Sequence, residues 1–350
     1  LSTGTTFDLA PASDVVVSLS NPAPSGTAST ATLFLTGGGQ GYSISTASYD
    51  NKSFSVASQE TIPSGLAFKS DGTKMYVSGY NTDKVYQYSF STAWDVSTAS
   101  YDSVSFALTP DVTVPRCLVF KPDGTKFYLT DNLDDRIYQY ALTTAWDLST
   151  ASYDNKNFSY SSQTVQGRGI AFKTDGTKVF LIDDASEIVY QYSLSTAWDI
   201  STASYDSKTL DVTSEDTTPT DIAFNSDGTK LLVVGQQNDL IYQYSLSTAW
   251  DVSTGSYDSV SFSLASQETD PIAITFDTTG SRFYIAGSLN DTVYQYSSQI
   301  AYTVTYDSSI KCELNEAPTS PALGDKDAYV FLTTDGGTTY YGKKAGDAVS

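Results

Sequence analysis

The sequence predicts an all-β protein made of repeats. The tripeptide Tyr-Gln-Tyr recurs every 52 residues, beginning at Tyr86, Tyr138, Tyr190, Tyr242 and Tyr294. A Trp-Asp pair recurs at the same spacing, and so does Asp-Gly-Thr-Lys, whose fifth copy reads Thr-Gly-Ser-Arg. Ser, Thr, Gly and Tyr are abundant, which favours strands and turns over helices. A fixed period of this length is the signature of a repeat architecture.

Each repeat contains four strand-like segments. In the first copy, the apolar run Leu66–Lys69 ends at Asp71-Gly72, and Asp-Gly between two such runs is a strong hairpin signal. Met75–Ser78, Val85–Ser89 and Tyr101–Leu108 follow, the last two with alternating residues. Four antiparallel strands per repeat of about 50 residues are typical of a β-propeller blade. Five repeats therefore predict a five-bladed β-propeller.

The first repeated element along the chain is a fourth strand without a blade. Residues 49–57 match the fourth strands at 101–108 and 257–264, whereas the last set of first to third strands occupies 273–297. We expect residues 49–57 to complete the fifth blade. This closes the ring and covers its last open strand edge, which would otherwise invite aggregation.

The two ends of the chain do not repeat. They contain six strand-like runs: Thr6–Leu9, Asp14–Leu19, Thr32–Leu35, Tyr302–Tyr306, Ala328–Thr333 and Thr338–Gly342. Neither end alone has enough strands for a stable core, but together they reach the size of a small sandwich. We predict a propeller over residues 42–299, inserted into a small discontinuous β-sandwich domain formed by residues 1–41 and 300–350.

Composition excludes several functions. The chain has 40 acidic and 19 basic residues, a net charge of −21, which argues against nucleic-acid binding. It has no histidine, which excludes a Ser-His-Asp triad and histidine metal ligands. Cys117 and Cys312 are expected to be free thiols. No apolar run approaches the ~18 residues of a membrane span, so no membrane insertion is expected.

Comparison of the repeat copies points to one face for binding. The loops between first and second strands and between third and fourth strands are nearly invariant, whereas the other two sets vary. Structural needs are the same in every blade, so invariance indicates scaffold and variation indicates selected binding or drift. We place candidate ligand contacts on the variable face, at Tyr80, Asn81, Arg116, Asn132, Arg168, Gln236, Gln237 and Asn290.

The repeated tryptophans allow two interpretations. Trp94, Trp146, Trp198 and Trp250 could be stacked sugar sites, because an indole suits a sugar face. A tryptophan repeated in every loop more often packs between blades, with the following Asp bonding turn amides. We favour packing.

One acid precedes the third strand of every blade: Asp83, Asp135, Glu187, Asp239 and Asp291. The third strand is far from the axis at ~4.8 Å per strand, so these groups cannot share one ion. We expect local turn bonding and no cofactor. Separate weak Ca²⁺ sites stay open beside Asp131, Asn132 and Asp134 or beside Asp183 and Asp184.

The inner strands offer no pair of catalytic carboxylates. Asp221 and Asp277 each depart from the other copies, but they lie four residues apart in repeat register, roughly 13 Å along a strand. A glycosidase needs two carboxylates ~5–9.5 Å apart. The residues therefore predict that the protein is not an enzyme.

The non-repeating ends resemble a small β-domain common in tailed-phage fibre and virion structural proteins. The resemblance rests on Ser18–Gly26 with Ala31–Gly38, and on Ala301–Tyr306 with Thr334–Gly342. Family members tend to carry Trp where Tyr306 and Cys312 stand. The repeats resemble uncharacterised propeller repeats of marine phage and bacterial surface proteins, which implies no activity.

This resemblance implies a non-catalytic structural protein of a virion or extracellular surface, whose propeller recognises a host receptor or glycan. A purely architectural decoration and a bacterial surface adhesin or lectin are the alternatives, and a glycosidase is a third. The implied partners are other virion or surface-assembly proteins, and symmetric homo-oligomers are implied by analogy. Leu1 in place of an initiator Met, without a signal-peptide pattern, suggests a fragment or processed product.

Overall fold

A computed structural model describes residues 44–298, apart from 109 and 111, together with the backbone of six strands in the flanking segments. The chain divides into two compact units. One is residues 42–298, and the other combines residues 1–41 with 299–350.

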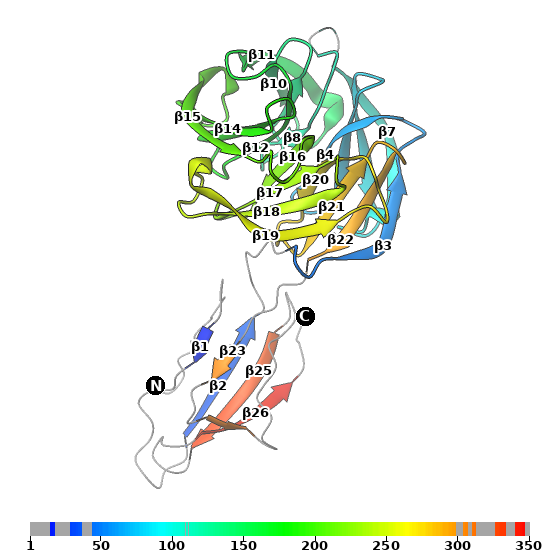
Figure 1. The fold of residues 1–350 in the computed structure, drawn as a ribbon. Helices are drawn as coiled ribbons and strands as arrows, with labels where there is room; N and C mark the ends of the chain where they lie inside the picture. Colours follow the sequence, from blue (N-terminus) through cyan, green and yellow to red (C-terminus); the bar gives the residue numbers. More distant parts are fainter. Residues whose placement is uncertain are drawn as a thin grey trace. The chain divides into compact units, whose positions relative to one another are not determined.

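The unit over residues 42–298 is a ring of five antiparallel four-stranded sheets, which confirms the predicted five-bladed β-propeller (Figure 1). Blade 1 consists of β4 (Pro63–Phe68), β5 (Lys74–Gly79), β6 (Lys84–Phe90) and β7 (Ala99–Ala107). Blade 2 consists of β8 (Val119–Phe120), β9 (Lys126–Asp131), β10 (Arg136–Leu142) and β11 (Ala151–Ser159). Blade 3 consists of β12 (Gly167–Phe172), β13 (Lys178–Asp183), β14 (Ile188–Leu194) and β15 (Ala203–Asp211). Blade 4 consists of β16 (Pro219–Phe224), β17 (Lys230–Gly235), β18 (Leu240–Leu246) and β19 (Gly255–Ser263).

Blade 5 closes the ring with strands from both ends of the repeat region. It consists of β20 (Pro271–Phe276), β21 (Arg282–Gly287), β22 (Thr292–Ser297) and β3 (Ser48–Ser55). β3 pairs antiparallel with β22, with Tyr294 opposite Ser53 and Gln295 opposite Lys52. The expected closure is confirmed: β3 covers the outer edge of β22, as the fourth strand covers the third in the other blades.

The glutamine of each Tyr-Gln-Tyr segment joins neighbouring blades. The side-chain oxygen of Gln87 accepts a bond from the backbone N–H of Leu148 in the next blade at 3.0 Å, and its Nε2 donates to Asp102 in its own blade at 2.8 Å. At the ring closure, Gln295 of blade 5 accepts from Val96 of blade 1 at 3.1 Å. A buried amide that satisfies groups on two blades explains why this motif is invariant.

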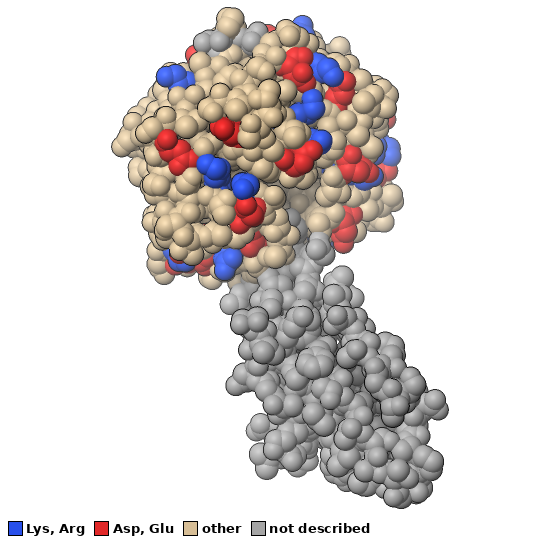
Figure 2. Space-filling model, turned by 180° about the vertical axis from the view of Figure 1, so that it is seen from behind, with Lys and Arg blue, Asp and Glu red and all other residues tan. Residues whose placement is uncertain are grey.

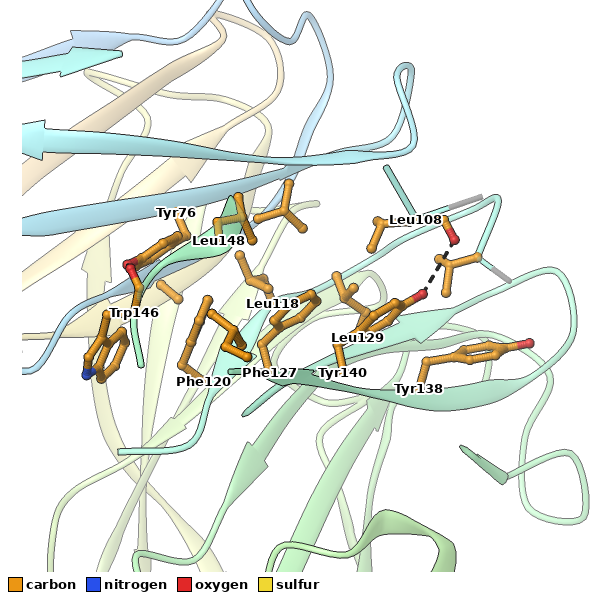
Figure 3. Packing of buried hydrophobic residues seen from close by; sticks show 14 residues of the cluster. Tyr76, Leu108, Leu118, Phe120, Phe127, Leu129, Tyr138, Tyr140, Trp146 and Leu148 are labelled. Carbon is orange, nitrogen blue, oxygen red and sulfur yellow. Dashed lines mark hydrogen bonds between the residues drawn. The ribbon is translucent and has the colours of Figure 1, made fainter. Parts of the chain in front are cut away.

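The repeated tryptophans pack between blades, as we expected. Trp146 is 9% exposed, and its ring stacks on Phe120 of its own blade, with centroids 5.2 Å apart. It also faces Tyr76 of blade 1, whose hydroxyl donates to the Trp146 carbonyl at 2.6 Å (Figure 3). On Gly124, a Cβ would lie 2.3 Å from the indole. With both faces of this ring covered, the sugar-stacking alternative is wrong for Trp146.

Four short 3₁₀ helices follow the Trp-Asp pairs: η1 (Val96–Thr98), η2 (Leu148–Thr150), η3 (Ile200–Thr202) and η4 (Val252–Thr254). Asp147 caps η2 by accepting the N–H of Ser149 at 3.1 Å, and the other three copies repeat this bond.

In the described residues no helix has the length and apolarity needed to cross a bilayer. On the face drawn in Figure 2, basic side chains lie among acidic ones rather than in one continuous patch.

The second unit joins the two ends of the chain. β2 (Ser29–Thr36) pairs antiparallel with β25 (Lys326–Thr333), and β1 (Val15–Val17) pairs in parallel with β23 (Val304–Tyr306). β24 (Ile310–Cys312) and β26 (Tyr340–Gly346) complete the larger sheet. The sandwich packing and the exact insertion boundaries stay predictions, and the expected run Thr6–Leu9 lies outside the described residues.

Candidate functional site

Two cavities lie on the propeller axis. The first, which we call the variable-mouth cavity, has a volume of about 320 Å³ and is lined by Ser64, Arg116, Arg168, Thr220 and Ile272. These residues are the five copies of one repeat position, at the start of the innermost strands. Because all five blades contribute the same position, the cavity surrounds the axis at the end formed by the variable loops. Tyr80, Gln236, Asp270 and Ser288 also line it.

The second, the aromatic-mouth cavity, has a volume of about 300 Å³ and lies toward the opposite ends of the same strands. Its wall includes five copies of one phenylalanine position: Phe68, Phe120, Phe172, Phe224 and Phe276. Asp221 and Cys117 are its titratable residues. Cys117 is a buried free thiol, as expected; the side chain of Cys312 lies outside the described residues.

Two arginines meet in the variable-mouth cavity. The guanidinium carbon of Arg116 lies 4.6 Å from the centroid of the Tyr80 ring. Arg168 forms an ion pair with Asp184. Burial, and then the charge of Arg168, lower the pKa of Arg116. Arg116 is the one arginine of the described residues without a carboxylate at ion-pair distance, although the chain is strongly acidic.

A carboxylate lies on another side of the same cavity. Asp270, which is half-buried, accepts hydrogen bonds from the side chains of Gln236 and Ser288. Its own backbone N–H donates to Glu268 at 2.9 Å. These bonds fix the orientation of the carboxylate, which lines the same cavity as the two arginines.

Three buried polar atoms around this cavity have no hydrogen-bond partner. They are Arg116 Nε, Asn132 Oδ1 and Asp184 Oδ1. Asn132 and Asp184 occupy the same repeat position as Tyr80, Gln236 and Ser288. Buried polar groups are almost always satisfied, so such a cluster is expected where a ligand or ordered water binds.

The structure brings together half of the contacts predicted from the sequence. Tyr80, Arg116, Arg168 and Gln236 line the cavity, whereas Asn81, Asn132, Gln237 and Asn290 do not. Asn81 and Asn290 have structural roles in their loops: their side chains donate to Thr61 at 2.9 Å and to the Gln267 carbonyl at 3.2 Å. Gln237 is exposed on its loop.

Sequence reasoning missed Asp270, Ser288, Ser64 and Thr220 as site residues. The signal that could have found Ser64 and Thr220 is the register of the repeat. Arg116 and Arg168 share one repeat position with Ser64 and Thr220, and that position lies in or just before the strand closest to the axis. Ranking positions by distance from the axis, instead of by loop, selects the whole ring.

One buried carboxylate per blade holds the variable loops. In blades 1, 4 and 5 it is Glu60, Asp216 or Glu268, from the loop that enters the blade, and the second strand ends in glycine. Glu60 accepts the backbone N–H groups of Ile62 at 2.8 Å and Thr82 at 3.2 Å. Burial raises the pKa of Glu268.

In blades 2 and 3 the carboxylate comes from the other side. Val112 and Thr164 replace the loop acid, and the second strand ends in Asp131 or Asp183 instead of glycine. Asp131 accepts the N–H groups of Thr113 and Leu133, each at 2.8 Å, and so joins the same two loops. The apparent variation at these positions is therefore two solutions to one structural need.

The acids that precede the third strands act through the backbone. All five have positive φ, between 49° and 58°. Their carbonyls accept a bond from the end of the fourth strand, such as Leu108 N–H to Asp83 at 2.9 Å. The expected turn role holds for them. Within residues 44–298, no group of three or more Cys, Asp or Glu is placed to hold a metal ion.

A family model described as "Lactonase, 7-bladed beta-propeller" matches residues 57–250, more than half of the chain. The matched stretch runs from β4 to β18. The described propeller has five blades, so it departs from the seven in the family description. No curated protein matches.

Solved structures with similar folds include three bacterial proteins. A putative 6-phosphogluconolactonase from Bacteroides uniformis is 17% identical over 66% of this chain and 65% of its own length, with a TM-score of 0.42. A periplasmic gluconolactonase from Pseudomonas aeruginosa is 14% identical over 82% and 70%, with a TM-score of 0.41. A functionally unknown protein from Desulfotomaculum acetoxidans is 13% identical over 82% and 86%, with a TM-score of 0.41. At these identities and TM-scores, none of them bears on the function of this chain.

The family match corrects two expectations. We expected a non-catalytic virion or surface structural protein and no enzymatic activity, and a lactonase model covering more than half of the chain overturns both. The physical error is identifiable. Catalysis was dismissed because Asp221 and Asp277 cannot form a glycosidase pair, but hydrolysis of a cyclic ester does not require two carboxylates.

Proposed function

The chain belongs to the lactonase family of β-propellers, and from this premise we propose that it hydrolyses a lactone in its variable-mouth cavity. The observation that carries the location is the meeting of Arg116, Arg168 and Asp270 in one cavity of about 320 Å³. The volume lies at the lower end of the usual range for small-molecule sites, which suits a single sugar ring.

Lactone hydrolysis has two demands that these groups meet. Water attacks the carbonyl carbon, and the carbonyl oxygen gains negative charge, which fixed donors stabilise. Arg116 is suited to this role because its Nε has no partner and no carboxylate neutralises it. The Tyr80 ring beside the guanidinium holds it in place.

Asp270 is suited to accept the proton of the attacking water. Its carboxylate is oriented by Gln236 and Ser288, and general-base catalysis requires an oriented acceptor within reach of the water. When the tetrahedral intermediate collapses, the ring C–O bond breaks and the ring oxygen takes up a proton. The product is the open hydroxy acid, with one water consumed.

Arg168 adds a second positive charge, so we propose a lactone that carries an anionic substituent. Burial lowers the pKa of Arg116, and the charge of Arg168 lowers it further; an anion bound between the two arginines would relieve their repulsion. The ion pair with Asp184 fixes the orientation of the Arg168 guanidinium.

The test is acid release by the 350-residue protein, followed with a pH indicator after subtraction of spontaneous hydrolysis. Glucono-δ-lactone and its 6-phosphate serve as the neutral and anionic substrates. We expect Arg116→Gln to lower kcat/KM by roughly 10²–10³-fold, the usual cost of one lost oxyanion donor. Asp270→Asn should lower kcat by about 10²–10⁴-fold.

Arg136→Gln is the matched control, because Arg136 lies on β10 outside the cavity and pairs with Asp134 at 3.3 Å. If the protein hydrolyses neither lactone faster than buffer alone, the proposal is refuted. Full activity in both cavity variants would refute the assigned site. The expected extracellular location, glycan partner and homo-oligomer stay predictions.

A further inference from the structure

We propose that the aromatic-mouth cavity is a second ligand site, which binds an apolar ammonium ion. It lies toward the opposite ends of the innermost strands from the variable-mouth cavity, and the proposal does not depend on the lactonase activity. The argument rests on the apolar wall, on one buried carboxylate within it and on the free lone pairs of that carboxylate.

Aliphatic and aromatic side chains make up most of the wall, and the polar residues Thr174, Asn225, Ser226 and Thr275 also line it. Each blade contributes one phenylalanine and one aliphatic residue at equivalent positions, such as Phe224 and Ile222 in blade 4. Ser226, which is exposed, also lines the cavity, so the cavity reaches solvent at the hairpin between β16 and β17. A volume of about 300 Å³ is roughly twice that of a cavity that holds benzene, so a bicyclic aryl group fits.

One acid interrupts this wall. Asp221 is 8% exposed, and its copies in the other blades are Gly65, Cys117, Gly169 and Ala273, so no other blade places a charge here. A Cβ on Gly169 would lie 2.1 Å from Asp221 Oδ1, which shows that the carboxylate occupies space left open by the neighbouring glycine. Burying a carboxylate in an apolar cavity is costly unless a cation pairs with it.

The carboxylate keeps hydrogen-bonding capacity for a ligand. Oδ1 accepts the N–H of Ile222 and Oδ2 accepts the N–H of Ile274, both at 2.9 Å. A carboxylate offers about four lone-pair directions, so two remain. An ammonium ion supplies donors and the compensating charge, and its apolar body fits the rings, which also attract cations.

The protonation of Asp221 makes binding depend on pH. Burial raises the pKa of Asp221 to about 7, an effect that the backbone N–H groups of Ile274 and Ile222 oppose. The other titratable side chain of the cavity is Cys117, whose thiol pKa burial raises to about 12, so it stays neutral. An ammonium ion requires ionised Asp221, so its affinity is full above pH 7 and falls as pH decreases.

The experiment compares two probes of equal shape, 1-naphthylmethylamine and 1-naphthylmethanol, by calorimetric titration of the full chain. At pH 8 we expect the amine to bind at least 10-fold more tightly than the alcohol. Between pH 8 and pH 5 its affinity should fall by roughly 100-fold, whereas that of the alcohol should not change. Equal affinities, or no binding of either probe, would overturn the proposal.

Asp221→Asn should remove the preference for the amine while keeping the binding of the alcohol. Asp221→Ala, which copies Ala273, is a second variant if the amide folds poorly. Asp277→Asn is the matched control, because Asp277 does not line the cavity and Asn225 holds its repeat position in blade 4. An amine preference that persists without the Asp221 carboxylate would contradict the assignment.

Discussion

Replacing Gly79 by Asp should strongly destabilise the propeller, and adding Glu60→Val should restore it. A Cβ on Gly79 would lie 1.9 Å from Oε2 of Glu60, so the introduced carboxylate and that of Glu60 would compete for one buried space. We expect the single change to cost about 3–5 kcal/mol, the usual penalty of an uncompensated buried charge. The double variant copies blade 2, where Val112 accompanies Asp131, and should lie within about 1 kcal/mol of the native protein.

Thermal and urea unfolding of the four members of this cycle measure the effect. Glu60→Val alone should also destabilise, because it removes the acceptor for the N–H groups of Ile62 and Thr82. The two single changes must therefore be far from additive. A double variant as unstable as the sum of the singles would show that the two carboxylate positions are not interchangeable.

Trp146→Ala should cost about 3–5 kcal/mol of unfolding free energy, the usual range for an aromatic ring removed from a core. The indole fills the space between Phe120, Tyr76 and Gly124, and none of these neighbours can close the gap without moving a blade. The melting temperature should fall by roughly 6–20 °C in calorimetry.

Two comparisons isolate the cause of this loss. Trp146 has φ of +63°, so Trp146→Gly removes the ring but relieves the backbone, and should be less destabilising than Trp146→Ala. Trp146→Phe keeps a stacked ring and should lose the least. An unchanged melting temperature in Trp146→Ala would show that the ring does not hold the blades together.

The architecture could be predicted from the sequence because it is periodic. A spacing of 52 residues, Asp-Gly hairpins and alternating segments predict four strands per blade, and the displaced fourth strand predicts the closure of β3 on β22. Each of these inferences uses residues close in sequence or one repeat apart. The expectation of a virion or surface protein failed because it rested on a resemblance of the flanking segments, whereas the family match lies in the repeats. The expectation of no catalysis failed because it considered only a pair of carboxylates.

The candidate site could be predicted only in part. Arg116 and Arg168 were identified because they lie in the variable loops, but Asp270, in the same set of loops, was not among the predicted contacts. Divergence between copies does not separate a residue that faces the cavity from one that faces solvent, such as Gln237. Comparison of the copies also cannot distinguish free variation from compensation between two positions, such as Glu60 with Gly79 in blade 1 and Val112 with Asp131 in blade 2.

The sequence by itself determined the number of blades, their strand order and the closing pair, because these follow from local patterns and a fixed period. Only the tertiary structure decided which copies of a position matter, because the ring brings residues 52 or more apart around one axis. Arg116, Arg168 and Asp270 share a cavity for this reason, and for the same reason Asp221 is the one acid among the residues that line the other cavity. Because the ring places equivalent positions around one axis, residues that depart from the repeat give its two axial cavities different chemistry.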